Sequence, residues 1–290
     1  MVQQGQTAAA RWAQGLAAWA IPATILAAAP ISPWGHMVPR FAGRADSAVE
    51  AARAGRGGVS YQRALDGLRL ALGGHGTVLD LGCGAGAASL PLLGEATGLT
   101  GVDPSEQMLT ELAQRAVLLA PATPCRTVLG RWPAVLDDLE IPVIGMHDIV
   151  VSHHVVFDVA AIGEFLTAAV AQARHVVVIE IPPTHPLTWM NPLWQRFWGL
   201  ERPTSPTWED LVAVIAEANL GPVTVDQWEQ TDLDPTSPGE RVGLVARRLC
   251  LAADRVDEVA DALVELGRSP GSPASSLRET VTITISVGAT

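Results

Sequence analysis

From about residue 76 onward, the sequence repeats one order of features: a short apolar run, a turn with glycine, proline or aspartate, and an amphipathic segment. This alternation predicts an α/β fold in which helices cover a largely parallel sheet. A β-branched run at about residues 279–287 predicts the last strand. The other predicted strands are Thr77 to Leu81, Leu99 to Asp103, Cys125 to Leu129, His147 to Ser152, His175 to Ile181 and Pro222 to Trp228.

Capping residues predict where three helices begin. Asp158 is placed to cap the helix that follows the fourth strand. Thr207 with Asp210 indicates a second helix start, and the pattern from Ser237 to Glu240 is typical of a capping box. The helix after Asp158 is the clearest, because its apolar residues recur at helical spacing, at Ile162, Phe165, Leu166, Ala169 and Val170.

The rest of the chain adds to this unit at both ends. Residues 1–75 have helical patterns interrupted by prolines, and we expect an N-terminal helical cap there. Residues 76–290 form the main domain, with a Trp/Pro-rich insertion at about 183–206 and extra helices at about 237–267.

Composition excludes several classes of function. The net charge is −11, so a surface for nucleic acid would have to form against the overall field. All 19 basic residues are arginine, and without lysine the chain can form neither a Walker A loop nor a pyridoxal phosphate site. The apolar stretch from Gly15 to Pro30 is shorter than the roughly 20 residues that span a bilayer. We expect no membrane and no nucleic acid partner.

The cysteines and histidines indicate neither disulfides nor a metal. Cys83, Cys125 and Cys250 are odd in number and far apart, which favours a reduced, cytoplasmic protein. The histidines lack a recognised metal-ligand spacing, so no metal site is predicted. The sequence is compatible with a homodimer and leaves the oligomeric state open.

The loop after the first strand, in "VLDLGCGAGAASL" (Val78 to Leu90), is the strongest functional signal. A glycine-rich turn between a strand and the helix after it brings the backbone close to a ligand. Gly82, Gly84 and Ala87 satisfy the dinucleotide pattern G-x-G-x-x-G/A, and Asp103 follows at the distance of a ribose-binding acid. Taken alone, this spacing favours NAD.

Two further details favour a cationic ligand. Asp80 stands two residues before the first glycine, and its carboxylate would repel a pyrophosphate. Gly86 completes a strictly alternating G-x-G-x-G. "LDLGCGAG" resembles motif I of the class I S-adenosylmethionine-dependent methyltransferases, and "GVDPSEQML" resembles the motif that follows it. The resemblance covers roughly residues 75–230 and implies a Rossmann-like seven-stranded sheet with helices on both faces.

The resemblance implies a role for each matching residue. The glycine loop with Asp80 would receive the methionine end of S-adenosylmethionine, and Asp103 would accept hydrogen bonds from both ribose hydroxyls. Met108 would lie near the adenine or in the core, and Trp132 would stack on the adenine or pack beneath a helix. Arg131 stands where many members of the family have an acid. The residues expected at the cofactor are Asp80, Gly82, Cys83, Gly84, Gly86, Asp103, Pro104, Met108, Arg131, Trp132 and Ser152.

The end of the fourth strand holds the candidate catalytic groups. His153 or His154 could act as a general base for a hydroxyl or amine acceptor, because imidazole has an ordinary pKa of about 6.5. Adjacent strand residues point to opposite faces, so one histidine is expected to line the site. The sequence favours His153, with His154 second.

The acceptor site is expected beneath tryptophan-rich segments. Aromatic walls with few polar groups are typical of small-molecule pockets, which favours an apolar or aromatic acceptor. The candidate residues are Trp34, Glu180, His185, Trp189 and Trp194.

The resemblance therefore implies a methyltransferase that acts on oxygen or nitrogen of a small molecule. Two alternatives stay open at this point. An NAD(P)-dependent oxidoreductase could use the same loop, and a noncatalytic module could bind S-adenosylmethionine without an acceptor pocket.

Overall fold

The computed structural model describes residues 5–34, 38–141, 143–231, 237–268 and 277–288. Its centre is a seven-stranded sheet in the order β3-β2-β1-β4-β5-β7-β6. The first five strands pair in parallel, and β7 is antiparallel to both of its neighbours. The strands are β1 (Thr77–Leu81), β2 (Gly98–Asp103), β3 (Cys125–Leu129), β4 (His147–His153), β5 (Ala173–Ile181), β6 (Val223–Thr231) and β7 (Leu277–Ser286). The predicted α/β fold with seven strands is confirmed.

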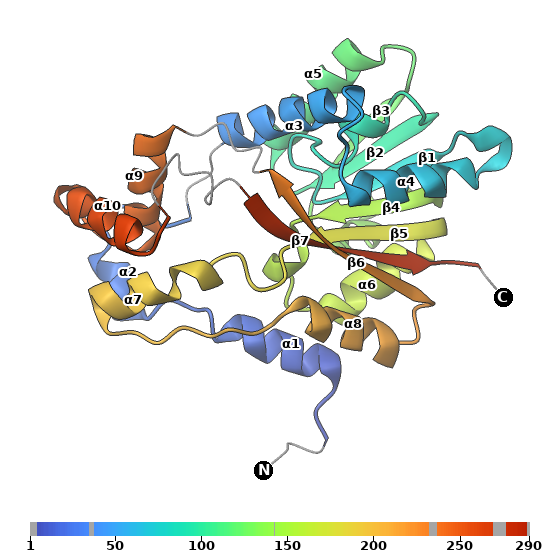
Figure 1. Ribbon diagram of the computed structural model, residues 1–290. Helices are drawn as coiled ribbons and strands as arrows, with labels where there is room; N and C mark the ends of the chain where they lie inside the picture. Colours follow the sequence, from blue (N-terminus) through green and yellow to red (C-terminus); the bar gives the residue numbers. More distant parts are fainter. Residues whose placement is uncertain (1–4, 35–37, 142, 232–236, 269–276, 289–290) are drawn as a thin grey trace.

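Helices cover both faces of the sheet (Figure 1). One face packs against α3 (Val38–Arg53), α4 (Val59–Arg69) and α5 (Glu106–Leu119), and its core includes Val78 and Val178. The opposite face packs against α1 (Ala8–Ala17), α6 (Ile162–Ala171) and α8 (Trp208–Glu217). Because side chains alternate along a strand, Asp80, His153 and Glu180 lie on the same face as α4.

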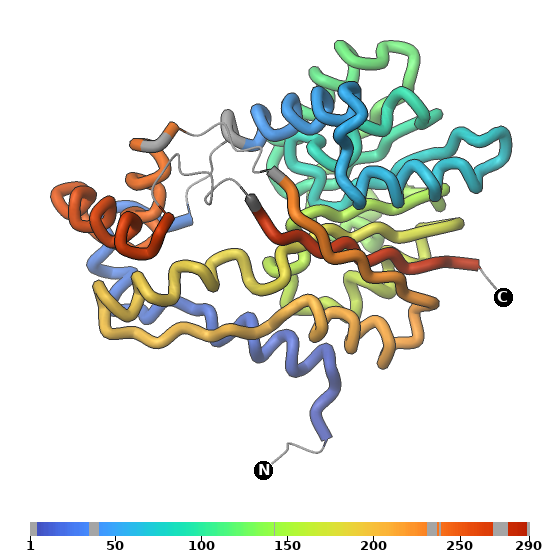
Figure 2. The backbone as a smooth tube through the Cα atoms, viewed as in Figure 1, coloured from blue at the N-terminus to red at the C-terminus, as the bar shows by residue number. Residues whose placement is uncertain are grey.

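Four further helices form a separate cluster, the side lobe, with its own apolar core. They are α2 (Ala23–Ala28), α7 (Asn191–Trp198), α9 (Pro238–Arg248) and α10 (Val256–Glu265). The side lobe lies beyond the edge where the parallel strands end, here called the carboxyl edge (Figures 1 and 2). The helices of residues 1–75 are thus spread over three places, the two faces of the sheet and the side lobe, instead of one cap.

Two local predictions are corrected by the structure. Asp158 does not cap α6: it ends a 3-10 helix, Val156–Asp158, and Ala161 stands at the helix start with no capping side chain. The segment after the glycine loop forms turns and a 3-10 helix, Leu90–Leu92, where an α-helix was expected. Capping boxes are present before α8 and α9, as predicted.

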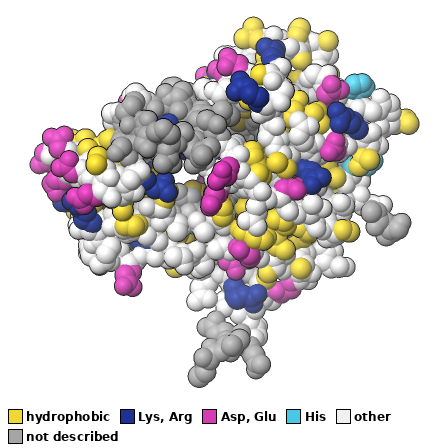
Figure 3. Space-filling model, in the orientation of Figure 1, with side chains coloured by type: hydrophobic (Ala, Val, Ile, Leu, Met, Phe, Trp, Pro, Cys, Tyr) yellow, Lys and Arg dark blue, Asp and Glu magenta, His cyan; other side chains and the backbone are white. Residues whose placement is uncertain are grey.

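Within the described ranges, no helix is long and apolar enough to cross a membrane. Figure 3 shows charged side chains of both signs over the visible face, with acidic ones gathered near α9 and α10. Acidic residues also open α10, at Asp257 and Glu258. In the part of the chain that the structure describes, no cluster of histidine, cysteine and acidic residues could hold a metal ion.

Candidate active site

The glycine loop after β1 adopts a backbone that only glycine takes up easily. Gly82, Gly84 and Gly86 have φ angles of 69°, 49° and 93°. A Cβ on Gly82 would lie 2.5 Å from Val155, and one on Gly86 would lie 2.5 Å from Leu112, so these two glycines permit close packing. A Cβ on Gly84 would meet no described atom within 4 Å. The backbone of Gly84 is therefore open to a ligand.

Asp103 at the end of β2 holds this loop in place. Its Oδ2 accepts a hydrogen bond from the Gly84 amide at 2.9 Å, and its Oδ1 accepts one from the Ser105 amide at 2.8 Å. A carboxylate has about four lone-pair positions, so each oxygen can accept a further hydrogen bond from a ligand hydroxyl. Pro104, the next residue, is exposed.

Asp80 lies beneath the loop and is almost fully buried. Ser89 donates a hydrogen bond to its Oδ2 at 2.6 Å, while Oδ1 has no hydrogen-bond partner among the described residues. Burial raises the pKa of Asp80 to about 7, the Ser89 hydrogen bond opposes this rise, and the charge of Asp103 adds to it. A buried carboxylate oxygen without a partner fits a cationic group of a ligand.

Several residues expected at the cofactor serve packing. Cys83 is buried behind the loop, and burial raises the pKa of its thiol well above the usual value. Met108 is on the buried face of α5 and packs in the core. Trp132 is buried beneath α6 and donates to the Phe165 carbonyl at 3.2 Å. Ser152 donates to the Leu81 carbonyl at 3.1 Å, which joins β4 to β1.

Arg131, in contrast, is exposed after β3. Burial raises the pKa of the Asp158 carboxyl, and the charges of Arg248 and Arg131 oppose this rise without cancelling it. Arg131 therefore contributes to the electrostatics of the carboxyl edge and not to the core.

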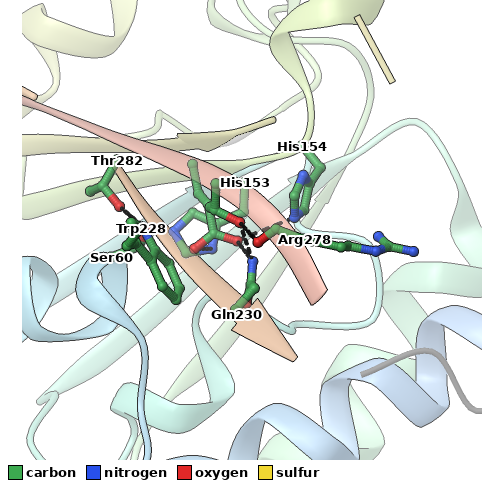
Figure 4. A network of polar contacts seen from close by, with 9 residues as sticks. Ser60, His153, His154, Trp228, Gln230, Arg278 and Thr282 are labelled. Atoms are coloured by element: carbon green, nitrogen blue, oxygen red, sulfur yellow. Dashed lines mark hydrogen bonds and ion pairs between the residues drawn. The ribbon is translucent and has the colours of Figure 1, made fainter. Parts of the chain in front are cut away.

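Both candidate histidines face one glutamate at the carboxyl edge (Figure 4). His154 Nε2 lies 3.2 Å from Glu180 Oε1, and His153 Nδ1 lies 3.9 Å from Glu180 Oε2. His154 has a positive φ of 60° because the chain turns away after β4, and its amide donates to the Glu180 carbonyl at 2.8 Å. This turn brings both rings to one carboxylate, which the expected alternation of a strand would not do.

The two histidines differ in exposure. The His153 side chain is 15% exposed and that of His154 is 44% exposed. Burial lowers the pKa of His153, against the attraction of Glu180. Burial also opposes the charge of Glu180, but His153, His154 and Ser60 together lower the pKa of its carboxyl below the ordinary value. Glu180 is thus an ionised acceptor between two imidazoles.

Residues that the sequence analysis missed surround Glu180 from β6, β7 and α4. Gln230 Nε2 lies 3.4 Å from Glu180 Oε1 and donates to Thr280 Oγ1 at 2.9 Å. Ser60 and Thr282 share a hydrogen bond of 2.7 Å. The signal was the alternation of threonines in "TVTITIS" (280–286), which places hydroxyls along one face of β7.

The aromatic residues expected around an acceptor are spread over the insertion and the side lobe. His185 stacks on Trp19, with ring centroids 3.9 Å apart, and burial lowers the pKa of His185 to about 4. Trp194 is buried in the core of the side lobe, and Trp189 packs against that core. Trp34 is 47% exposed, with the Arg248 guanidinium 5.2 Å from its ring centre. Most of these contacts serve packing.

Residues 78–177 match a family model described as a methyltransferase domain. The chain contains a methyltransferase domain. The matched segment begins in β1, includes the glycine loop and Asp103, and ends in β5. S-adenosylmethionine is the cofactor of this methyltransferase family, and it replaces the dinucleotide that the glycine spacing alone favoured.

Comparison with solved structures gives several chains that are similar to this one at low sequence identity. The magnesium protoporphyrin IX methyltransferase of Synechocystis PCC 6803 is 17% identical, with 79% of this chain and 84% of that chain covered and a TM-score of 0.45. The YcgJ protein of Bacillus subtilis is 14% identical (73% and 92% covered, TM-score 0.47). A putative methyltransferase from Bacillus halodurans C-125 is 12% identical (76% and 96% covered, TM-score 0.46). The search of curated proteins found no match.

Proposed function

We propose that this methyltransferase methylates a hydroxyl or amine of a small molecule, with His154 as the general base. The observation that carries the proposal is the His154 side chain, which is half exposed at the carboxyl edge and 3.2 Å from the buried Glu180 carboxylate. The net charge of −11 argues against a nucleic acid acceptor. No membrane or metal is invoked.

Three groups would hold the cofactor, which supplies an electrophilic methyl group when it is bound. The unpartnered Oδ1 of Asp80 fits the ammonium, and the open backbone at Gly84 permits close approach. Asp103 has lone pairs left for the ribose hydroxyls. Of these groups, Asp80 is the one that a cation would change most, because a nearby positive charge lowers the pKa of a buried carboxyl.

The role of His154 depends on which nitrogen of its ring carries the hydrogen. An ionised carboxylate can only accept hydrogen bonds, so the Nε2 that faces Glu180 carries the ring hydrogen. Nδ1 is then the basic nitrogen and can take the proton that the acceptor loses as its new bond to the methyl carbon forms. Glu180 stabilises the imidazolium that results. His153, which the sequence favoured, is too buried to meet an acceptor as easily.

The test is release of S-adenosylhomocysteine from S-adenosylmethionine with a panel of phenols, alcohols, amines, carboxylic acids and thiols. We expect turnover with a phenol, alcohol or amine, and a loss of roughly 100-fold or more in His154→Asn. His75→Asn is the matched control, since His75 is an exposed histidine before β1, at the opposite end of that strand from the glycine loop. Full turnover in His154→Asn would refute the assignment of the base, and turnover only with carboxylic acids would refute the acceptor class.

A further inference from the structure

One donor to Glu180, Gln230, comes from β6, and β7 orients the groups around it; both strands lie outside the segment that matches the methyltransferase family. Figure 4 shows Gln230 and Trp228 from β6 close to Thr282 from β7, and the register places these side chains on the same face of the sheet as Glu180. Glu180 itself pairs with Thr282 across β5 and β7. A buried carboxylate without such donors would be costly.

The first group of donors runs through Gln230. Thr280 donates its hydroxyl hydrogen to the Arg278 carbonyl at 3.4 Å, so its oxygen is free to accept from Gln230 Nε2 at 2.9 Å. The second hydrogen of the same amide nitrogen points to Glu180 Oε1 at 3.4 Å. Both hydrogens of the Gln230 amide are thus used, and the orientation of the amide is fixed.

The second group of donors runs through Thr282 and Ser60. The Trp228 indole can only donate, and it donates to Thr282 Oγ1 at 2.9 Å. If Thr282 in turn donates to Ser60 at 2.7 Å, the Ser60 hydrogen is left for Glu180, and that hydrogen bond lowers the pKa of the glutamate. This is the direction in which every hydrogen of the chain has an acceptor.

Resting on the proposed function, we propose that Gln230 is a positioning residue: with Ser60 it holds the Glu180 carboxylate against His154 Nε2 and so keeps Nδ1 as the basic nitrogen. The reacting atoms never touch Gln230. The β6–β7 pair therefore orients the general base, although the pair lies outside the matched methyltransferase segment.

The experiment measures the reactivity of the His154 ring without an acceptor. Diethyl pyrocarbonate acylates the unprotonated imidazole nitrogen, and the rate at His154 is followed by peptide mass spectrometry at about pH 8, well above the ordinary imidazole pKa. We expect a rate roughly 10-fold lower in Glu180→Gln. Gln230→Met should lower it on the order of 3-fold, and the double variant should be no slower than Glu180→Gln.

Gln227→Met is the matched control, because Gln227 is exposed on the opposite face of the same strand. An unchanged rate in Gln230→Met, or a double variant with additive losses, would overturn the proposal. If Gln230→Met does not fold, Thr280→Val removes the hydroxyl that fixes the amide and must give the same result. Turnover retained in His154→Asn would refute the base assignment alone, since the acylation rates report the positioning of the ring independently.

Discussion

Asp80→Asn should make the ligand-free protein more stable above neutral pH while it removes binding of the cofactor. The folded pKa of Asp80 is about 7, against an ordinary value of 3.8. A raised carboxyl pKa contributes stability that is fully present below pH 3.8 and is lost as the pH rises through about 7. The difference of about three pH units corresponds to about 4 kcal/mol of unfolding free energy at pH 8.

The asparagine substitution restores only part of the unfolding free energy that the ionised Asp80 costs. Its oxygen can still accept from Ser89, but its amide group would occupy the place of Oδ1, which has no described partner. An unsatisfied buried donor costs about 1–3 kcal/mol, so the net gain at pH 8 is about 1–3 kcal/mol. For a chain of this size, that gain raises the melting temperature by roughly 2–5 °C.

The assay is urea unfolding of both proteins from pH 5 to pH 8, with and without S-adenosylhomocysteine. The difference in unfolding free energy between the wild type and the variant isolates the contribution of Asp80 from that of the other titrating groups. We expect this difference to grow in favour of the variant between pH 5 and pH 8, and the ligand to stabilise the wild type only. Parallel curves at all pH values would refute the raised pKa of the buried Asp80 carboxyl, and equal stabilisation of both proteins by the ligand would remove Asp80 from the cofactor site.

Further substitutions test the loop, the insertion and the first helix. Gly84→Ala should abolish binding of S-adenosylhomocysteine in calorimetric titration, while Gly73→Ala, at another positive φ where a Cβ meets no described atom within 4 Å, should leave it unchanged; equal affinities would show that the loop does not approach the ligand. His185→Phe should flatten the loss of stability between pH 6.5 and about pH 4, because the folded pKa of His185 is lowered to about 4 and the protonated unfolded chain is favoured in that range; an unchanged acid transition would contradict this. Trp12→Leu should lower the unfolding free energy by about 2–4 kcal/mol in urea, since the ring is fully buried and its N–H donates to Val159; a change below about 1 kcal/mol would contradict it.

Much of the sheet could be predicted because its strands are short apolar runs between turn residues. Val78, Val150 and Val177 lie on buried central strands, where local sequence and tertiary environment agree. Asp158 failed as a helix cap because the chain first forms a 3-10 turn, a choice that packing of Val156 and Phe157 decides. Capping patterns close to a strand end therefore carry less information than those after a long loop.

The candidate site could be predicted only where its residues come from consecutive elements of the chain. The glycine loop follows β1 and Asp103 ends β2, and these two consecutive strands pair in the sheet. The donors around Glu180 do not come from consecutive elements, since Ser60 and Thr282 are 222 positions apart. The tryptophans show the same limit, because an indole in a pocket wall and one in a core, such as Trp194, have the same local pattern.

The first helix has a consequence for synthesis of the chain. The Trp12 indole N–H donates a hydrogen bond to the Val159 carbonyl, 147 positions later. The Ala8 amide donates one to the Glu217 carboxylate, 209 positions later. A ribosome adds about 5–20 residues per second, so α1 waits roughly 7–30 s for its first partner to emerge. During that interval its apolar face is available to chaperones, and α1 can dock on the domain only after residues 159 and 217 have been made.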